Sequence, residues 1–210
     1  MRPSTSLRIV FAVYDGVSLL DLSGPLEAFR IADDFTLKEK GVTYKCVIVS
    51  TRGGPVRTAD GVELNTQSVR IFAKKQIDTL VVPGAFDVEN VTRDLALVQW
   101  LRKTAPACRR VCAISTGGFL LAASGILDGH RAAIHWMHAP PLHTLYPNVT
   151  IDPDATCVDD HGVWTSAGVG SGIDLALALI EQDAGREVAI KVARILDLKL
   201  ASGAGKRIDF

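Results

Sequence analysis

The stretch RRVCAISTGGFLLAASG, residues 109–125, decides the fold that the sequence predicts. Its apolar run 111–114 has the length and composition of a buried strand. Ser115 and a pair of glycines come soon after, and residues 119–123 are helix formers with no breaker before Gly125. Small residues in such a turn let the backbone fold back closely on itself. The stretch therefore predicts a strand, a sharp turn and a helix, with Ser115 at the corner.

Two interpretations of Ser115 are open on the local sequence. Residues 113–117, AISTG, match the nucleophile-elbow pattern Gly-x-Ser-x-Gly except for the alanine at the first position. In that interpretation the Ser115 side chain points out of the carboxyl edge of a sheet, beside the amino terminus of a helix. In the other interpretation Ser115 is only a helix cap, whose hydroxyl accepts a hydrogen bond from the N–H of Gly117 or Gly118.

The composition is ordinary, and its charges do not indicate a nucleic-acid-binding surface. The 210 residues favour one large domain, and 23 basic residues balance 23 acidic ones without a basic patch. The apolar runs are too short to span a bilayer, and the amino terminus leads directly into an expected strand, so we expect a cytoplasmic protein. The cysteines lack CxxC spacing, and Cys112 lies in the expected strand as a buried thiol rather than in a disulfide.

Outside this stretch, expected strands and helices alternate along the chain. Residues 7–14 form a run that is apolar except at Arg8, as in a strand that is covered on both faces. Asp21 or Ser23 is expected to open the first helix, with Pro25 in its first turn. The other expected elements are strands at 44–50, 78–82, 131–136, 149–151 and 162–166, a hairpin at 56–64 around Asp60-Gly61, and helices at 95–103, 140–146, 170–183 and 187–198. This alternation predicts an α/β three-layer sandwich, with a mostly parallel sheet and helices on both faces.

Three loops are expected at the carboxyl edge of this sheet, at residues 15–25, 83–87 and 114–118. In open α/β sheets, ligands bind outside the carboxyl ends of the strands. We therefore expect these loops to converge on one site.

Four segments, in this order, resemble a known superfamily: LLDLSGPLEAF at 19–29, DTLVVPGAFD at 78–87, AISTGGFLLAASGILDGHRAAIHW at 113–136 and TSAGVGSGIDLALALI at 165–180. They resemble the ThiJ/PfpI superfamily, which has the class I glutamine amidotransferase-like, flavodoxin-like fold. Within it the chain is most similar to the ligand-sensing amino-terminal domains of AraC-type transcriptional regulators and to the isocyanide hydratases. The resemblance covers roughly residues 7–198.

The resemblance implies a cysteine at the elbow, followed by Thr-Gly, where this sequence has Ser115, Thr116 and Gly117. Cys112 lies one turn too early to replace that cysteine. An elbow thiol is ionised by the helix amino terminus and neighbouring groups, whereas a serine hydroxyl needs an adjacent general base. We therefore expect that the thiol chemistry is lost.

The resemblance places two candidate catalytic partners, Asp21 and His135, near Ser115. Asp21 could instead be a helix cap, and His135 could be a buried core residue that is merely hydrogen-bonded. The family's oxyanion-hole loop Pro-Gly-Gly is Pro-Gly-Ala here, at 83–85, and we expect its backbone N–H groups to survive the change. The ligand-binding candidates are Asp21, Gly84, Ala85, Ser115, Thr116 and Gly117. No cofactor and no metal is implied.

The function implied by the resemblance is small-molecule sensing in an AraC-type transcriptional regulator, catalytically silent because Ser115 replaces the elbow cysteine. We expect a ThiJ/PfpI-like domain over residues 1–200, and a tail or the start of a linker over 201–210. DNA would be bound only through a domain absent from these residues, and relatives of this fold usually form homodimers. The alternative is a stand-alone isocyanide-hydratase-like lyase, or a hydrolase, that uses Ser115 with Asp21 and His135.

Other polar residues support weaker hypotheses. His135, His138 and His143 could form a metal site, but Pro140-Pro141 interrupts any helix there and no carboxylate or cysteine completes the set. A hydrolase built from Ser115, Asp152 or Asp154, and His161 is disfavoured by the hairpin and the short chain. A solvated acidic turn, rather than a calcium loop, is expected at Asp152, Asp154, Asp159 and Asp160.

Overall fold

The computed structural model describes residues 5–39, 41–72, 77–87 and 92–198, and the backbone at 201–202 and 206–207. Its centre is an eight-stranded sheet of order β3-β4-β2-β1-β5-β6-β10-β9. The pairs β3–β4 and β9–β10 are antiparallel, and the five other pairs are parallel, which confirms the expected α/β class. The strands are β1 Thr5–Ala12, β2 Val42–Ser50, β3 Gly54–Arg57, β4 Glu63–Ser68, β5 Thr79–Val82, β6 Arg110–Ile114, β9 Cys157–Asp160 and β10 Val163–Ser166.

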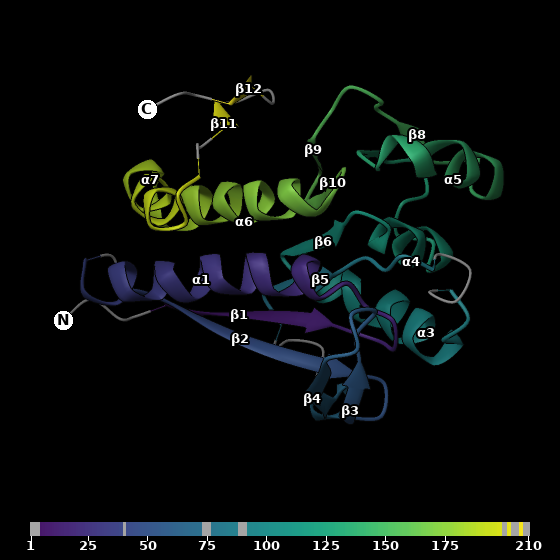
Figure 1. Cartoon of the computed structure of the whole chain (residues 1–210), viewed down its shortest axis with the longest axis horizontal. Coiled ribbons are helices and arrows are strands. Elements are labelled where there is room, and N and C mark those ends of the chain that lie inside the picture. Colours follow the sequence, from purple (N-terminus) through teal and green to yellow (C-terminus); the bar gives the residue numbers. More distant parts are fainter. Residues whose placement is uncertain are drawn as a thin grey trace.

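Helices cover both faces of this sheet (Figure 1). On one face lie α1 (Leu19–Glu39), α6 (Val169–Ala184) and α7 (Arg186–Ile195). On the other lie α3 (Leu95–Thr104) and α4 (Gly117–Ala123), and α5 (Ala139–Leu145) joins the same core. The short elements are η1 Val69–Ile71, η3 Ala105–Ala107, η4 Trp136–His138, the pair β7 Arg131–Ala132 with β8 Thr150–Ile151, and the pair β11 Ala201–Ser202 with β12 Lys206–Arg207. The arrangement is the three-layer sandwich that the sequence predicted.

The second half of the central strand β1, residues 9–12, is apolar at every position, and all four of these residues are buried. Ile9 and Phe11 pack in the core below α1 and α6, whereas Val10 and Ala12 pack in the core on the opposite face. Successive side chains of a strand point to opposite faces, so the part of β1 that has helices on both sides has no solvent-facing positions.

The hairpin expected around Asp60-Gly61 is present. β3 pairs antiparallel with β4, Val56 lies opposite Leu64, and Gly61 has a φ of 84°. A positive φ in a tight hairpin loop favours glycine, which explains the sequence signal.

The first helix begins earlier than the sequence predicted. α1 starts at Leu19, and Ser18 Oγ accepts a hydrogen bond from the backbone N–H of Asp21 at 3.4 Å. Ser18 therefore takes the capping place that the sequence predicts for Asp21 or Ser23. Pro25 lies inside the helix and not in its first turn. The shift places Asp21 in the first turn, where its side chain reaches another loop.

Two further predictions were wrong. The strand expected at 131–136 is only Arg131–Ala132, because His135 Nδ1 accepts the N–H of Met137 at 3.4 Å and so opens the one-turn helix η4. The expected acidic turn is partly the strand β9. This strand lies at the edge of the sheet, where charged side chains are common, so its aspartates are compatible with strand structure.

A buried ion pair joins the start of β6 to the end of α6. Arg110 Nη2 lies 2.7 Å from Asp183 Oδ2, and the two side chains are only 3% and 2% exposed. Arg110 Nε also donates to Thr79 Oγ1 at 3.1 Å, and Arg109 Nη2 donates to Asp183 Oδ1 at 2.8 Å. The pair holds α6 at the amino end of β6, opposite to the loop that contains Ser115.

The cysteines are all free, and Cys112 is buried in β6, as expected. Burial raises the pKa of its thiol, so Cys112 stays protonated and does not replace a nucleophile at the elbow. Within the described ranges, no helix combines the length and the apolar character that a membrane span requires.

Candidate functional site

A pocket of about 280 Å³ lies where the three expected loops meet, next to the carboxyl ends of β5 and β6. The loop before α1 contributes Ser18, and the first turn of α1 contributes Asp21. The loop after β5 contributes Ala85, and the loop after β6 contributes Ser115 and Thr116. The remaining lining residues are Phe86, His135, Met137, His138 and Gly168. The structure thus brings together Asp21, Ser115 and His135, which the sequence singled out.

Ser115 has the backbone of an elbow residue. Its φ is 51°, in the left-handed region that non-glycine residues rarely occupy, and its N–H donates to the Ser166 carbonyl at 2.9 Å. The helix-cap interpretation is wrong, because the Gly118 N–H donates to the Ser115 carbonyl, at 3.2 Å, and not to its hydroxyl. Among the described residues, no hydrogen-bond partner is present for that hydroxyl. Ser115 therefore lines the pocket with a hydroxyl that is available to a bound molecule.

Two glycines make the close packing around the elbow possible. A Cβ at Gly84 would lie 2.6 Å from Thr116 Oγ1 and 2.7 Å from Asp21 Oδ2. A Cβ at Gly117 would collide with the carbonyl oxygen of Val82. Neither glycine lines the pocket itself. Both stand behind it, where they let the loops after β5 and β6 approach each other.

We expect Gly117→Ala to be less stable than Gly118→Ala by about 1–3 kcal/mol, the usual penalty of overpacking. The added Cβ meets backbone at Gly117, whereas at Gly118 it meets only the end of the Ile134 side chain, at 3.2 Å. Both changes raise helix propensity equally, so the second variant is a matched control. Urea unfolding measures the difference. Equal stabilities would contradict the packing described for Gly117.

Asp21 is a buried carboxylate with one satisfied oxygen. Its Oδ2 accepts the Gly84 N–H at 3.1 Å, while its Oδ1 is buried without a partner. Burial raises the pKa of Asp21 to about 6, and the hydrogen bonds from Gly84 and Ser18 oppose this only in part. The side chain therefore links the first loop to the second and does not cap α1.

Thr116 closes the second loop onto the third. Its Oγ1 donates to the Ala85 carbonyl at 2.6 Å and accepts the Ala85 N–H at 2.7 Å. Together with the bond from Gly84 to Asp21, this occupies the backbone N–H groups of both Gly84 and Ala85. Both backbone N–H groups that we expect at the oxyanion-hole loop are present, and each donates to a side chain of the same site.

His135 lies at the pocket as half of a histidine pair. Its ring centroid is 5.9 Å from that of His138, and it is half-buried before η4 rather than in a core strand. Burial and the neighbouring His135 lower the pKa of His138. In the described part of the chain, no hydrogen bond joins His135 or Asp21 to Ser115. His143 lies outside the lining, as do Asp152, Asp154 and His161 of the second hydrolase arrangement.

Sequence reasoning missed several pocket residues. Phe86 and Met137 are large apolar side chains that are 75% and 56% exposed, and they line the pocket with His138. Phe86 directly follows the Pro-Gly-Ala loop at 83–85, and this position in the sequence could have indicated that it lies at the pocket. The pocket position of Met137 could not be predicted, because the sequence predicts a strand over 131–136 and not the one-turn helix η4 that contains Met137.

Comparisons with known proteins match most of the chain. The model of a family described as the DJ-1/PfpI family matches residues 7–182. The HTH-type transcriptional regulator CdhR of Pseudomonas aeruginosa is 33% identical over 183 residues, which are 87% of this chain and 52% of the regulator. The isonitrile hydratase of Pseudomonas putida is 28% identical over 93% of this chain and 78% of the hydratase. In the crystal structure of an AraC family transcriptional regulator from Pseudomonas putida, 99% of the crystallised chain superposes on 90% of this one, with a TM-score of 0.75 and 22% identity.

Proposed function

Since the chain belongs to the DJ-1/PfpI family, we propose that it is the small-molecule-sensing part of an AraC-type transcriptional regulator. The pocket at Ser115 binds the ligand, and a separate domain binds DNA. The identity to CdhR supports this proposal, and the chain spans about half of that regulator's length. The proposal also includes the homodimer that the family resemblance implies and the cytoplasmic location that the sequence predicts.

One observation carries the proposal that this site binds rather than catalyses. Catalysis at an elbow needs hydrogen-bond donors aimed at the developing oxyanion. Here the N–H of Gly84 is bound to Asp21 and the N–H of Ala85 is bound to Thr116, at 3.1 and 2.7 Å. Donors that are already engaged within the protein do not stabilise new negative charge unless those bonds break.

The state of Ser115 supports the same conclusion. A serine hydroxyl is a weak nucleophile unless a base accepts its proton. In the described part of the chain neither His135 nor Asp21 is hydrogen-bonded to that hydroxyl: His135 Nδ1 accepts the Met137 N–H, and Asp21 Oδ2 accepts the Gly84 N–H. The pocket retains the shape of a binding site, with an uncommitted hydroxyl and a buried carboxylate oxygen that a ligand N–H or O–H would satisfy.

The alternative function is an isocyanide-hydratase-like lyase. Two observations favour it as the second candidate: the strained elbow at Ser115 is kept, with a φ of 51°, and isonitrile hydratase is 28% identical over most of its length. Hydration would add one water molecule to an isocyanide to give an N-substituted formamide.

The first experiment separates the two candidates with an alkyl isocyanide as the probe. We expect N-alkyl formamide to form at the rate of buffer alone, with the wild-type chain and with Ser115→Ala. Formamide that forms with the wild type and is lost in Ser115→Ala would establish an enzyme and overturn catalytic silence. The same two proteins can be compared by thermal melting, to exclude a folding defect as the cause of any difference.

The regulator part of the proposal has a separate test. An immunoblot of source-cell extracts, with antibody raised to this chain, should detect a protein heavier than 22.5 kDa by at least one small domain. A species of only 22.5 kDa would contradict the proposed regulator.

A further inference from the structure

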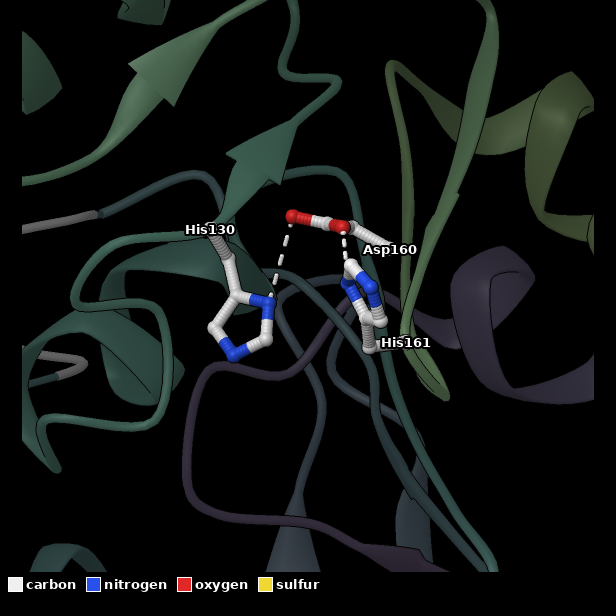
Figure 2. Close-up of side chains that lie close together, drawn as sticks. All are labelled: His130, Asp160 and His161. Carbon is white, nitrogen blue, oxygen red and sulfur yellow. Dashed lines mark hydrogen bonds and ion pairs between the residues drawn. The ribbon is translucent and has the colours of Figure 1, made fainter.

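Two histidines and one aspartate form a cluster that shares no residue with the Ser115 pocket (Figure 2). His130 Nδ1 lies 3.2 Å from Asp160 Oδ2, and His161 Nδ1 lies 2.6 Å from Asp160 Oδ1. The two rings therefore approach different oxygens of one carboxylate. One ligand atom from each of the three residues lies within 4.8 Å of the other two.

Two members of the cluster are held by the backbone around them. The N–H of His130 donates to the Leu127 carbonyl at 3.0 Å, and its carbonyl accepts the Thr150 N–H at 2.9 Å. Asp160 Oδ2 accepts the backbone N–H of Arg131 at 2.7 Å. The side chains of His130 and Asp160 are 26% and 20% exposed. Their donor atoms are thus pre-positioned, which lowers the entropic penalty of binding an ion between them.

His161 is the adjustable member. Its side chain is 89% exposed, yet its backbone is fixed in the loop between β9 and β10. His161 has a φ of 55° and Gly162 a φ of 85°, as in the tight two-residue hairpin loops with both φ values positive. The hairpin keeps the imidazole beside Asp160, while rotation about its side-chain bonds brings Nδ1 to the distance that a shared ion requires.

We propose that His130, Asp160 and His161 bind a divalent transition-metal ion of the zinc class. Zinc binds imidazole nitrogen and carboxylate oxygen at about 2.0–2.2 Å, so tetrahedral ligands lie roughly 3.3–3.5 Å apart, a spacing that a small closure of the 4.8 Å cluster provides. Two imidazoles and one carboxylate form a known zinc donor set, with a fourth position left for water. The nitrogen donors select against Mg²⁺ and Ca²⁺, which take oxygen ligands.

The backbone N–H of Arg131 donates to the Asp160 carboxylate and so acts as an outer-shell partner of the proposed site. Hydrogen bonds of this kind orient the ligating groups of metal sites. The bound ion would link the segment before β7 to the β9–β10 hairpin, which lie 30 residues apart at His130 and Asp160. Because the unfolded chain lacks the assembled site, Zn²⁺ should raise the unfolding temperature of the chain.

The test is a calorimetric titration of the untagged, chelator-treated 210-residue chain with Zn²⁺ alone. We expect one ion per chain. His161→Asn should weaken binding at least about tenfold, the lower end of what even outer-shell partners contribute, because it removes one ligand. Asparagine tolerates the left-handed backbone of this position, so the hairpin is retained. Asp160→Asn is the second variant and should weaken binding to at least the same degree.

The matched control is His143→Ala, which removes an exposed imidazole from α5, outside the cluster. It should bind Zn²⁺ as the wild type does and show the same rise in unfolding temperature. Absence of Zn²⁺ binding to the wild type would overturn the proposal. Equal affinity of the wild type and His161→Asn for Zn²⁺ would overturn it as well. It would also be overturned if the pocket double variant His135→Ala/His138→Ala lost Zn²⁺ binding while His161→Asn kept it.

Discussion

Replacing Asp183 with alanine should lower the free energy of unfolding by about 3–5 kcal/mol, the range for removing one partner of a buried ion pair. Asp183 is 2% exposed and lies 2.7 Å from Arg110, whose own side chain is 3% exposed. The variant leaves the Arg110 guanidinium buried. Its remaining side-chain contacts are Thr79 Oγ1 at 3.1 Å, Gln182 Oε1 at 3.5 Å and Asp78 Oδ1 at 3.6 Å. None of them replaces a carboxylate at 2.7 Å.

Urea unfolding at neutral pH measures this loss, and a thermal scan should show a midpoint lower by roughly 6–20 °C for a chain of this size. Arg186→Ala is the control, because its ion pair with Glu181 lies at the surface, with side chains 46% and 36% exposed. Exposed pairs contribute at most about 1 kcal/mol. If both variants lost the same small amount, Asp183 would not be the anchor of α6 that its contacts indicate.

The second large effect is a pH dependence that originates at Asp21. Its pKa is about 6 in the folded protein and 3.8 in the ordinary state of the side chain. Between these values the folded chain binds a proton that the unfolded chain has released, so the free energy of unfolding falls as the pH rises from about 4 to 6. A pKa shift of this size corresponds to a loss of up to about 3 kcal/mol in the free energy of unfolding. This loss is complete above pH 6 and absent below pH 4.

Asp21→Asn removes this titration. The measurement is the difference in free energy of unfolding between variant and wild type, taken by urea unfolding at several pH values. That difference should move by up to about 3 kcal/mol in favour of the variant between pH 4 and pH 7. The buried NH₂ of asparagine adds an offset, but the offset does not vary with pH.

Asp34→Asn, on the same helix, serves as the comparison, because the Asp34 side chain is 70% exposed and its charge is hydrated. It should follow the wild type at every pH. An Asp21→Asn curve parallel to the wild type would mean that the buried carboxylate does not hold its proton near pH 6.

The fold could be predicted because its signals are local. Residues 111–123 contain a complete strand, turn and helix, and the topology of a parallel sheet then brings the loops after successive strands to one edge. For this reason we expect the loops at 15–25, 83–87 and 114–118 to meet at one site, and residues from all three line the pocket. The family resemblance, confirmed by the match over residues 7–182, places Asp21 and His135 next to Ser115, and all three line the pocket.

What could not be predicted depends on contacts between distant side chains. Nothing in the sequence indicates that Thr116 Oγ1 accepts the N–H of Ala85, 31 residues away, because a threonine after an elbow does not by itself show which groups its hydroxyl contacts. His130 and Asp160 are separated by 30 residues, and Arg110 and Asp183 by 73. Their pairing depends on which strands become neighbours, and no periodicity records it.

The position of the buried ion pair has a consequence for how such a chain can diversify. Arg110 is the first residue of β6, and Ser115 follows the last one. The ion pair that anchors α6 and the pocket therefore lie at opposite ends of one short strand. If the pocket binds a ligand as proposed, residues at the Ser115 end can be exchanged for new ligand preferences while the Arg110 end keeps the chain above the stability threshold that selection enforces. A scaffold divided in this way can acquire new specificities without first acquiring new stability.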